Sequence, residues 1–322
     1  MLLRCLLAVV GGLLLAAAFE PIGVAVLLPV GVACWALSLR GLPASRAWVP
    51  SLLFGVFFIF AVMVWMRAVG TDAWLAMCAI EAAFFAPLGA LVAWSGRSRA
   101  WPLWSALLWA GVEYLRSVWP FSGMPFGRLA YATADTAWEA ALPLVGMTGV
   151  SVVVALTGTL LAWAILAVRR RPARVAAVAA AWCVLVGASQ VLPSFTSVAG
   201  TARIAVVQGN VPGSGTDVVA VHPQVTRNHV EATRELADAV EAGEVPRPDL
   251  VLWPENSTAV DPFRDGVREQ IESAVDAIGV PVLVGGMVDG PTPQYVLNQG
   301  IVWRPELGGG DRYTKRHPVP YG

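Results

Sequence analysis

The sequence predicts two parts of different class: a polytopic α-helical membrane domain over residues 1–195 and an α/β domain over residues 201–322. Hydrophobic residues make up 57% of the chain and charged residues only 14%, with a mean hydropathy of +0.63. Such a composition is typical of membrane proteins. The apolar runs lie almost entirely before residue 200, and most of the charge lies after it. Strand-like and helix-like segments alternate in this second part, which is the pattern of an α/β domain.

Seven apolar runs approach the roughly 20 residues that a helix needs to cross a bilayer. The first run carries Arg4 and ends in small residues, as a cleaved signal peptide does. We predict a membrane helix instead, because Glu20 and Pro21 lead at once into a second apolar run. The seven predicted spans are Met1 to Phe19, Ile22 to Leu39, Ser51 to Met66, Ala73 to Trp94, Trp101 to Val118, Val150 to Val168, and Val175 to Leu192.

The arginines are unevenly distributed over the loops between these spans, and this predicts an orientation. With the N-terminus in the cytoplasm, nine arginines fall in inside loops and three in outside loops, which obeys the positive-inside rule. An odd number of spans then places the chain after Pro193 on the extracytoplasmic side of the membrane. The inside set is Arg4, Arg40, Arg46, Arg97, Arg99, Arg169, Arg170, Arg171 and Arg174, and the outside set is Arg67, Arg116 and Arg128.

Two carboxylates lie within predicted spans, where an ionised group is costly unless it is paired. Glu113 and Arg116 are three residues apart on one helix, so we predict that they pair with each other and serve structure. Glu81 has no partner nearby in the sequence. It either faces other protein segments or is neutral, and a contact with substrate is the alternative.

The part after residue 200 has the pattern of an α/β domain. β-Branched runs predict strands, and apolar residues at helical spacing predict helices. Three consecutive glycines at 308–310 predict a loop. The predicted order is strand 203–208, helix 225–240, strand 250–253, helix 265–278, strand 281–286 and strand 300–303.

Glu255 follows the strand 250–253 directly after Pro254. Proline cannot continue a central strand, and it biases the residue before it toward an extended shape. A carboxylate at the end of a buried strand is therefore held rigidly enough to serve as a catalytic base. The alternative is an acidic residue in a surface turn.

Lys315 is the single lysine among the 22 Lys and Arg residues. A chain that otherwise uses arginine for every positive charge favours lysine only where a compact ammonium is needed. The alternative is chance survival of one lysine.

Other classes of partner and site have no support in the sequence. The formal net charge is zero, so nothing indicates a nucleic acid. The four cysteines are Cys5, Cys34, Cys78 and Cys183, all in apolar runs and without metal-ligand spacing. We therefore expect no metal site.

Five motifs, in family order over nearly the whole chain, resemble the apolipoprotein N-acyltransferase family, which belongs to the nitrilase (carbon–nitrogen hydrolase) superfamily. Each motif is weak alone, and the resemblance rests on their combination. The motifs are EYLR at 113–116, SGMPF at 122–126, VQGNVP at 207–212, WPENS at 253–257 and the segment 313–322 around Lys315.

The resemblance implies transfer of an acyl chain from a membrane phospholipid to the diacylglyceryl-cysteine amine of a lipoprotein, the final step of lipoprotein maturation, through a cysteine thioester. It implies that Glu255 is the base and that Lys315 stabilises the oxyanion. Asn256, Tyr313 and Glu81 are candidates for substrate contact. The expected partners are the phospholipid donor, the lipoprotein acceptor and the bilayer, with no cofactor, and the protein is expected to act as a monomer. The α/β domain would be the first half of a nitrilase-like αββα sandwich.

The sequence also departs from the family. The nucleophilic cysteine of the family lies well beyond its lysine motif, whereas this sequence stops seven residues after Lys315. We therefore expect a fragment that is inactive alone, with its cysteine downstream of Gly322. Pro318 replaces a usual aliphatic residue, and no tryptophan follows shortly after Asn210. Two alternatives remain: a membrane-tethered amidase or nitrilase-type hydrolase that uses water, and a non-enzymatic membrane binding module.

Overall fold

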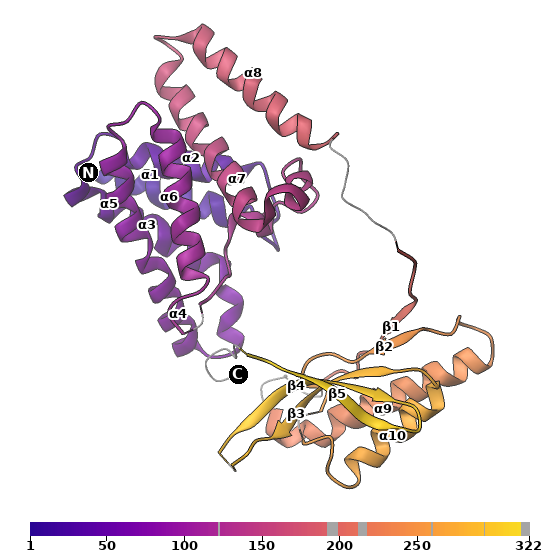
Figure 1. Cartoon of the computed structure of the whole chain (residues 1–322). Coiled ribbons are helices and arrows are strands. Elements are labelled where there is room, and N and C mark those ends of the chain that lie inside the picture. The colour runs from indigo at the N-terminus through magenta and orange to yellow at the C-terminus, as the bar shows by residue number, and fades with distance from the viewer. Residues whose placement is uncertain (122, 192–198, 212–217, 259, 293, 317–322) are drawn as a thin grey trace. The chain divides into compact units, whose positions relative to one another are not determined.

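The protein divides into two compact units, Met1–Thr196 and Ser197–Gly322. The structure is a computed structural model, and it describes residues 1–121, 123–191, 199–211, 218–258, 260–292 and 294–316 (Figure 1). Each unit has its own core of buried hydrophobic residues. Among the described residues, the first unit contains only helical elements, and the second combines a sheet with two helices.

Each of the seven predicted apolar runs contains helix in the first unit. The α-helices are α1 (Leu2–Ala16), α2 (Leu27–Leu39), α3 (Ala44–Val62), α4 (Thr71–Ala83), α5 (Phe85–Ser95), α6 (Trp101–Arg116), α7 (Leu142–Ala167) and α8 (Pro172–Ser189). Short 3-10 turns are η1 (Val64–Ala68), η2 (Leu129–Ala132) and η3 (Glu139–Ala141). Leu192, the predicted end of the last run, lies outside the described residues.

The helices differ from the predicted runs in two places. The run Ala73 to Trp94 is two helices, α4 and α5, broken at Phe84. Pro87 lacks an N–H, and its ring crowds the carbonyl four residues earlier, which interrupts the helix there. The third helix, in contrast, continues through Pro50 and begins at Ala44 rather than at Ser51.

Three helical stretches in the described part of the chain are long and apolar enough to cross a membrane: Ala44–Val62, Thr71–Ser95 and Glu139–Ala167. α1, α2 and most of α8 are apolar but shorter. Apolar helices of this kind fit a membrane domain. The number of crossings stays a prediction.

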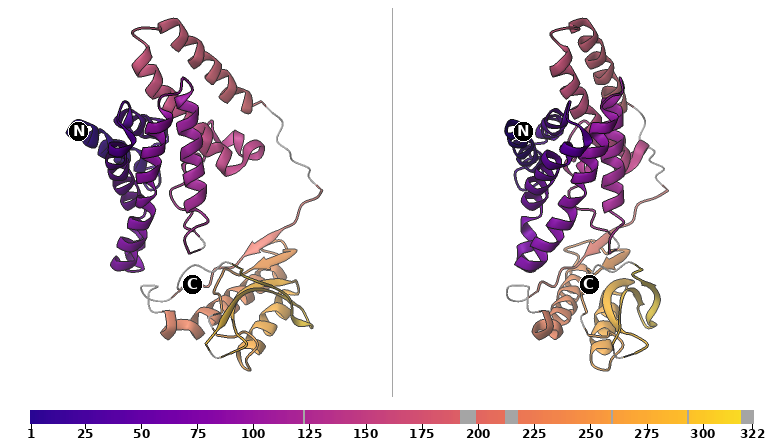
Figure 2. Two further views of the ribbon diagram at one scale, coloured as in Figure 1. Left: turned by 60° about the vertical axis from the view of Figure 1, so that its left-hand side comes forward. Right: turned by 90° about the vertical axis from the view of Figure 1, so that its left-hand side faces the viewer.

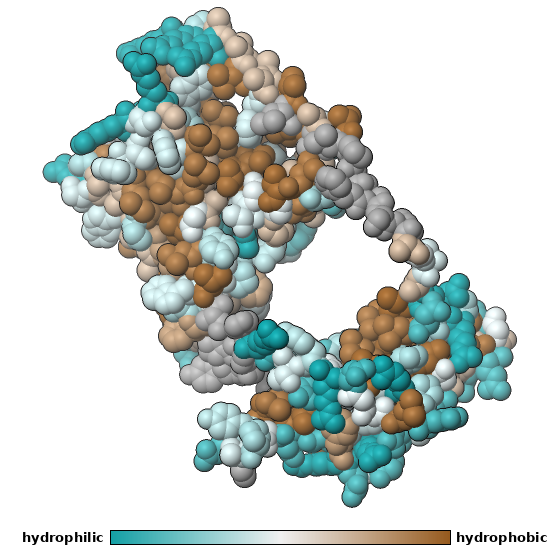
Figure 3. Space-filling view, viewed as in Figure 1, coloured by the Kyte–Doolittle hydropathy of each residue, from teal (hydrophilic) through white to brown (hydrophobic). Residues whose placement is uncertain are grey.

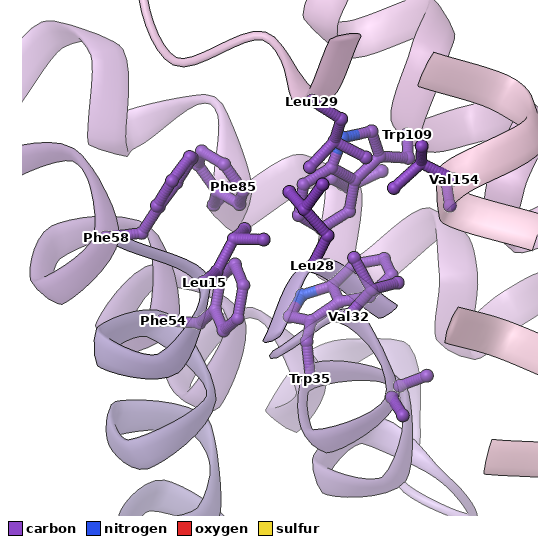
Figure 4. Close-up of a cluster of buried hydrophobic side chains, with 14 of the residues drawn as sticks. Leu15, Leu28, Val32, Trp35, Phe54, Phe58, Phe85, Trp109, Leu129 and Val154 are labelled. Atoms are coloured by element: carbon purple, nitrogen blue, oxygen red, sulfur yellow. The ribbon is translucent and has the colours of Figure 1, made fainter. Parts of the chain in front are cut away.

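Aromatic side chains fill the centre of the helical unit (Figure 4). The Trp35 and Trp109 rings meet edge to face with centroids 4.9 Å apart, and Phe85 lies 5.5 Å from Trp109. α7 packs closely on α2 because Gly158 has no side chain: an added Cβ would lie 2.8 Å from the carbonyl oxygen of Pro29. Small residues at such crossings are the usual way for apolar helices to associate in membranes.

Arg116 holds three segments together inside the helical unit. Its Nη1 lies 2.7 Å from Oε2 of Glu81 on α4, and both side chains are almost fully buried. The same guanidinium donates to the carbonyl oxygens of Phe126 and Gly127, at 2.6 and 2.9 Å. Glu81 is therefore paired, and its predicted contact with substrate stays a prediction.

The predicted pairing of Glu113 with Arg116 is wrong. Glu113 instead accepts a hydrogen bond from the backbone N–H of Leu129 at 3.0 Å and another from Ser151 on α7. Its ion-pair partner is Arg128, at 3.4 Å. The two side chains are neighbours on one helix, but the chain segments around α6 offer each of them better partners.

The second unit is built on a five-stranded mixed sheet in the order β1-β2-β3-β4-β5. β1, β2 and β3 are parallel, while β4 and β5 are antiparallel additions. The elements are β1 (Ile204–Val206), α9 (Val218–Glu241), β2 (Leu250–Leu252), α10 (Val267–Ile278), β3 (Val282–Asp289), β4 (Val296–Arg304) and β5 (Gly308–Thr314). The loop predicted at 308–310 is wrong, because these glycines begin β5.

α9 and α10 lie on the same face of the sheet (Figure 2). Val282, Val284, Ile301 and Trp303 point toward the helices and are fully buried. Alternate residues point to the other face, which no described element of this unit covers. Leu252, Leu283 and Val302 are partly exposed there, and Val206 is 75% exposed.

We expect Arg116→Met to destabilise the helical unit more than any exposed arginine change does. The substitution leaves the Glu81 carboxylate buried without its partner, which typically costs about 3–5 kcal/mol. Thermal unfolding in detergent, followed by circular dichroism, measures the effect, with Arg169→Met as the exposed control. The double variant Glu81→Leu/Arg116→Met should recover part of the loss. A single variant as stable as the control would contradict the structural role.

Candidate active site

The loop after β2 presents Glu255 at the carboxyl end of the strand. The Trp253 N–H still donates to the Leu283 carbonyl of β3 at 2.9 Å, and Pro254 then ends the ladder. Gly285 lets the loop lie directly on β3, because an added Cβ there would lie 2.8 Å from Cα of Glu255. The position of Glu255 is therefore fixed by backbone packing.

Residues that follow Glu255 tie the loop back to β3. Ser257 Oγ donates to the carbonyl oxygen of Gly285 at 2.8 Å. The Thr258 carbonyl accepts from the N–H of Met287 at 2.9 Å, which forms an isolated parallel bridge. The loop is thus held on both sides of the carboxylate.

Lys315 reaches Glu255 across 60 residues of sequence. Its Nζ lies 2.9 Å from Oε1 of Glu255, and the same oxygen accepts from Nδ2 of Asn298 at 2.6 Å. The Lys315 N–H donates to the carbonyl oxygen of Asn298 at 2.9 Å, one step beyond the last residue of β5. The two residues predicted as base and cation therefore lie in direct contact.

The two hydrogen bonds favour the ionised carboxylate. The pKa of Glu255 lies below its usual value, chiefly because of the hydrogen bond from Lys315 and next because of the one from Asn298. The Glu255 side chain is 56% exposed and that of Lys315 35% exposed. Both bonds go to Oε1, so Oε2 has no hydrogen bond from the described residues.

A buried polar chain supports the strand below the site. Nε1 of Trp253 donates to Oγ1 of Thr233 at 2.9 Å, and that hydroxyl donates to the carbonyl oxygen of His229 at 2.8 Å. The His229 ring lies 5.3 Å from the Trp253 ring, between centroids. Burial lowers the pKa of His229, although its hydrogen bond to the Val225 carbonyl opposes this shift. His229 is thus a neutral support for Trp253.

The remaining predicted contact residues of this unit lie at the surface. Tyr313 is 63% exposed and pairs in register with Gly300, which pairs in turn with Gly285. Tyr313 and Lys315 are two residues apart and point to the same face of the sheet. Asn256 is exposed in a left-handed conformation with φ of 58°.

Asn298 is the site residue that sequence analysis missed. It lies in no motif, and only the register of β4 with β3 and β5 reveals its position beside Glu255. Among the described residues, no cluster of three or more His, Cys, Asp or Glu side chains is arranged to hold a metal. All four cysteines belong to the helical unit.

Comparison with known proteins identifies relatives of both units. Residues 11–160 match the family described as "Apolipoprotein N-acyltransferase N-terminal domain". Over 98% of its length, the chain is 35% identical to the apolipoprotein N-acyltransferase of Mycolicibacterium smegmatis and 32% identical to that of Methylococcus capsulatus. It covers 57% and 64% of those two proteins, respectively. A Bordetella bronchiseptica relative is 30% identical over 68% of the chain and 42% of its own length.

Lys315→Ala should raise the pKa of Glu255, because the largest influence that favours the ionised form is lost. The folded-state pKa of Glu255 is lowered, so the pair contributes stability at neutral pH and loses it as the pH falls through that pKa. An exposed pair contributes less than about 1 kcal/mol. Carbon-13 NMR titration of labelled glutamate measures the change, with Glu255→Gln identifying the signal and Arg316→Ala as control. An unchanged Glu255 titration would contradict the pairing.

Proposed function

The chain belongs to the apolipoprotein N-acyltransferase family, and we propose that this protein transfers an acyl chain from a membrane phospholipid to a lipoprotein. In the first step a cysteine thiolate attacks the phospholipid ester, the C–O bond breaks, and a lysophospholipid leaves. The α-amine of a diacylglyceryl-cysteine then attacks the thioester, which forms the amide and frees the thiol. Dividing the transfer in two replaces one difficult displacement with two easier ones.

The contact of Glu255 with Lys315 carries this proposal. An ionised carboxylate with one uncommitted oxygen can take the proton of a thiol, which is the work of a general base. The Lys315 ammonium, 2.9 Å from Glu255, supplies positive charge for the oxyanion of the tetrahedral intermediate. An added Cβ at Gly300 would meet only Leu283, at 3.6 Å, so the sheet surface next to Tyr313 is open.

We propose that Asn256 and Tyr313 border the candidate active site and contact substrate. Both are exposed, and Tyr313 stands at the end of the row formed with Gly300 and Gly285. The nucleophile is proposed to be a cysteine outside residues 1–322, because residues 197–322 contain none and the first two relatives extend well beyond the length of the match.

A nitrilase-like αββα sandwich is proposed for the α/β unit. Helices cover one face of the sheet, while the opposite face carries partly exposed aliphatic side chains at Leu252, Leu283 and Val302. A second sheet packed on that face would bury them, as in sandwich folds.

We further propose that the helical unit crosses a bacterial cytoplasmic membrane several times, with the α/β unit on the extracytoplasmic side. The nine-to-three arginine distribution supports this orientation. Both lipid substrates could then enter from the bilayer, and the protein is proposed to act as a monomer without a cofactor.

A reporter enzyme that works only after export should be active when fused after residue 193. The positive-inside rule gives this result if the arginine-rich loops are cytoplasmic. Fusions after Arg99 and Arg171 serve as matched controls and should be active only with a cytoplasmic reporter. Cytoplasmic activity at residue 193 would reverse the proposed orientation.

Lys315→Arg should impair acyl transfer about as much as Lys315→Ala. The proposed role needs a compact charge next to the oxyanion, and a planar guanidinium is wider. Loss of one oxyanion-stabilising group costs on the order of 10²–10³ in rate. Glu255→Gln should abolish thioester formation.

The measurement is the single-turnover rate of acyl-enzyme formation from a phospholipid. It uses protein expressed from the complete gene. Arg316→Ala, an exposed neighbour, is the control and should remain near wild type. An arginine variant within a few-fold of wild type would remove Lys315 from the mechanism. Release of free fatty acid with no lipoprotein amide would favour a hydrolase.

A further inference from the structure

A large cavity opens at the arginine-rich end of the helical unit, remote in sequence from Glu255 and Lys315. Its volume is about 930 Å³, at the upper end of the range for small-molecule sites. It lies between the start of α6, the end of α7 and the start of α8, and Arg40 after α2 completes its wall. Figure 3 shows hydrophilic surface over the turn between α7 and α8 and hydrophobic surface over the helices next to it.

Five arginines line this cavity, and they have no acidic counterpart. They are Arg40, Arg99, Arg170, Arg171 and Arg174. The chain has no Asp or Glu from residue 21 to 71, from 82 to 112, or from 140 to 216, and every residue that lines the cavity lies in one of these segments. Positive charge gathered around a concave wall attracts an anion more strongly than the same charge on an open surface.

Four of these guanidinium groups are not held by hydrogen bonds or ion pairs to the described residues, whereas Arg40 is. Arg40 donates to the Gly96 carbonyl oxygen at 2.6 Å and stacks on Trp101 at 4.5 Å. The other four make no side-chain hydrogen bond or ion pair with the described residues. Arg174 even lies in the first turn of α8, where the helix dipole disfavours a cation. A bound anion would offset that cost.

Apart from Ser98, the rest of the cavity wall is apolar or aromatic. Trp101, Leu103, Leu160 and Trp163 contribute to it from α6 and α7. A cavity lined by both arginines and apolar side chains matches an amphiphile with an anionic head and an acyl chain. Basic pockets between membrane helices on the cytoplasmic side bind acidic lipid headgroups in this way, and arginine suits phosphate because it can donate two parallel hydrogen bonds.

We propose that this cavity binds an anionic phospholipid, with Arg99, Arg170 and Arg174 on the headgroup phosphate and the α6–α7 wall on an acyl chain. The site is separate from the candidate active site and does not depend on the proposed acyl transfer. Topology alone does not require it, because Arg46, Arg97 and Arg169 supply positive charge at the same end without lining the cavity.

The test measures binding of phosphatidylglycerol to the purified chain in neutral detergent by native mass spectrometry. Arg99→Gln/Arg170→Gln/Arg174→Gln should weaken binding about 100-fold, since each basic residue at an anionic lipid surface contributes about 1 kcal/mol and 1.4 kcal/mol is a factor of ten. The matched control Arg46→Gln/Arg97→Gln/Arg169→Gln removes the same charge from the same end and should bind within a few-fold of wild type. Equal losses in both triple variants would overturn the site.

A second variant separates the cavity from its charge. Val178→Trp keeps every arginine but fills space between α8 and α7, so it should also weaken binding. Val178→Trp leaves the charges in place. It therefore tests whether the lipid binds in the cavity even if the cavity triple variant proves unstable in a melting test. Wild-type affinity in Val178→Trp would exclude the cavity as the binding place.

Two further ligands identify what is recognised. Phosphatidylcholine should bind far more weakly than phosphatidylglycerol, and inorganic phosphate should not displace the lipid at comparable concentration. Equal binding of phosphatidylcholine would overturn the proposed selectivity for an anionic lipid. Displacement by free phosphate would assign the arginines to a soluble anion and overturn the lipid proposal.

Discussion

The backbone ladder between β4 and β5 is the constraint on which the candidate active site depends. It carries Lys315 beside Asn298, and both side chains then face Glu255 at 2.9 and 2.6 Å. A slip of one residue would turn Lys315 to the opposite face of the sheet, because side chains alternate along a strand. Glu255 is fixed independently by the close contact of its loop with Gly285. The ion pair exists because two separate backbone registers agree.

Inside the helical unit, buried charged side chains are likewise held by partners from distant parts of the chain. Arg116 satisfies Glu81 and two backbone carbonyls, while Glu113 gathers donors from Leu129, Ser151 and Arg128. In each case an irregular segment after α6 supplies backbone groups that a helix cannot offer. Charged residues in apolar helices are tolerated when such partners are available. These contacts also fasten the loop after α6 to the bundle.

Sequence patterns were sufficient for the features that depend on local periodicity. The apolar runs predicted the helices, and the strand–proline–carboxylate order predicted where Glu255 would lie. Features that depend on long-range pairing were not accessible. Glu81 and Arg116 are 35 residues apart, so the nearer Glu113 was a misleading partner. β5 begins with three glycines, whose weak strand preference is overcome by pairing with β4. Asn298 carries no sequence signal, because its role arises only from the register of its neighbours.

Several helices of the bundle are shorter than the thickness of a bilayer. At 1.5 Å per residue, the 13 residues of α2 extend about 20 Å and the 16 residues of α6 about 24 Å, whereas the hydrocarbon layer of a typical bilayer is about 30 Å thick. α3, with 19 residues, and the part of α7 after its kink at Gly146 match that layer. If the bundle spans a bilayer, such unequal helices would thin the bilayer or draw headgroups inward along the shorter ones. Hydrophobic mismatch would then make the thickness of the surrounding membrane a variable that acts on α6, and through Arg116 on the loop it holds.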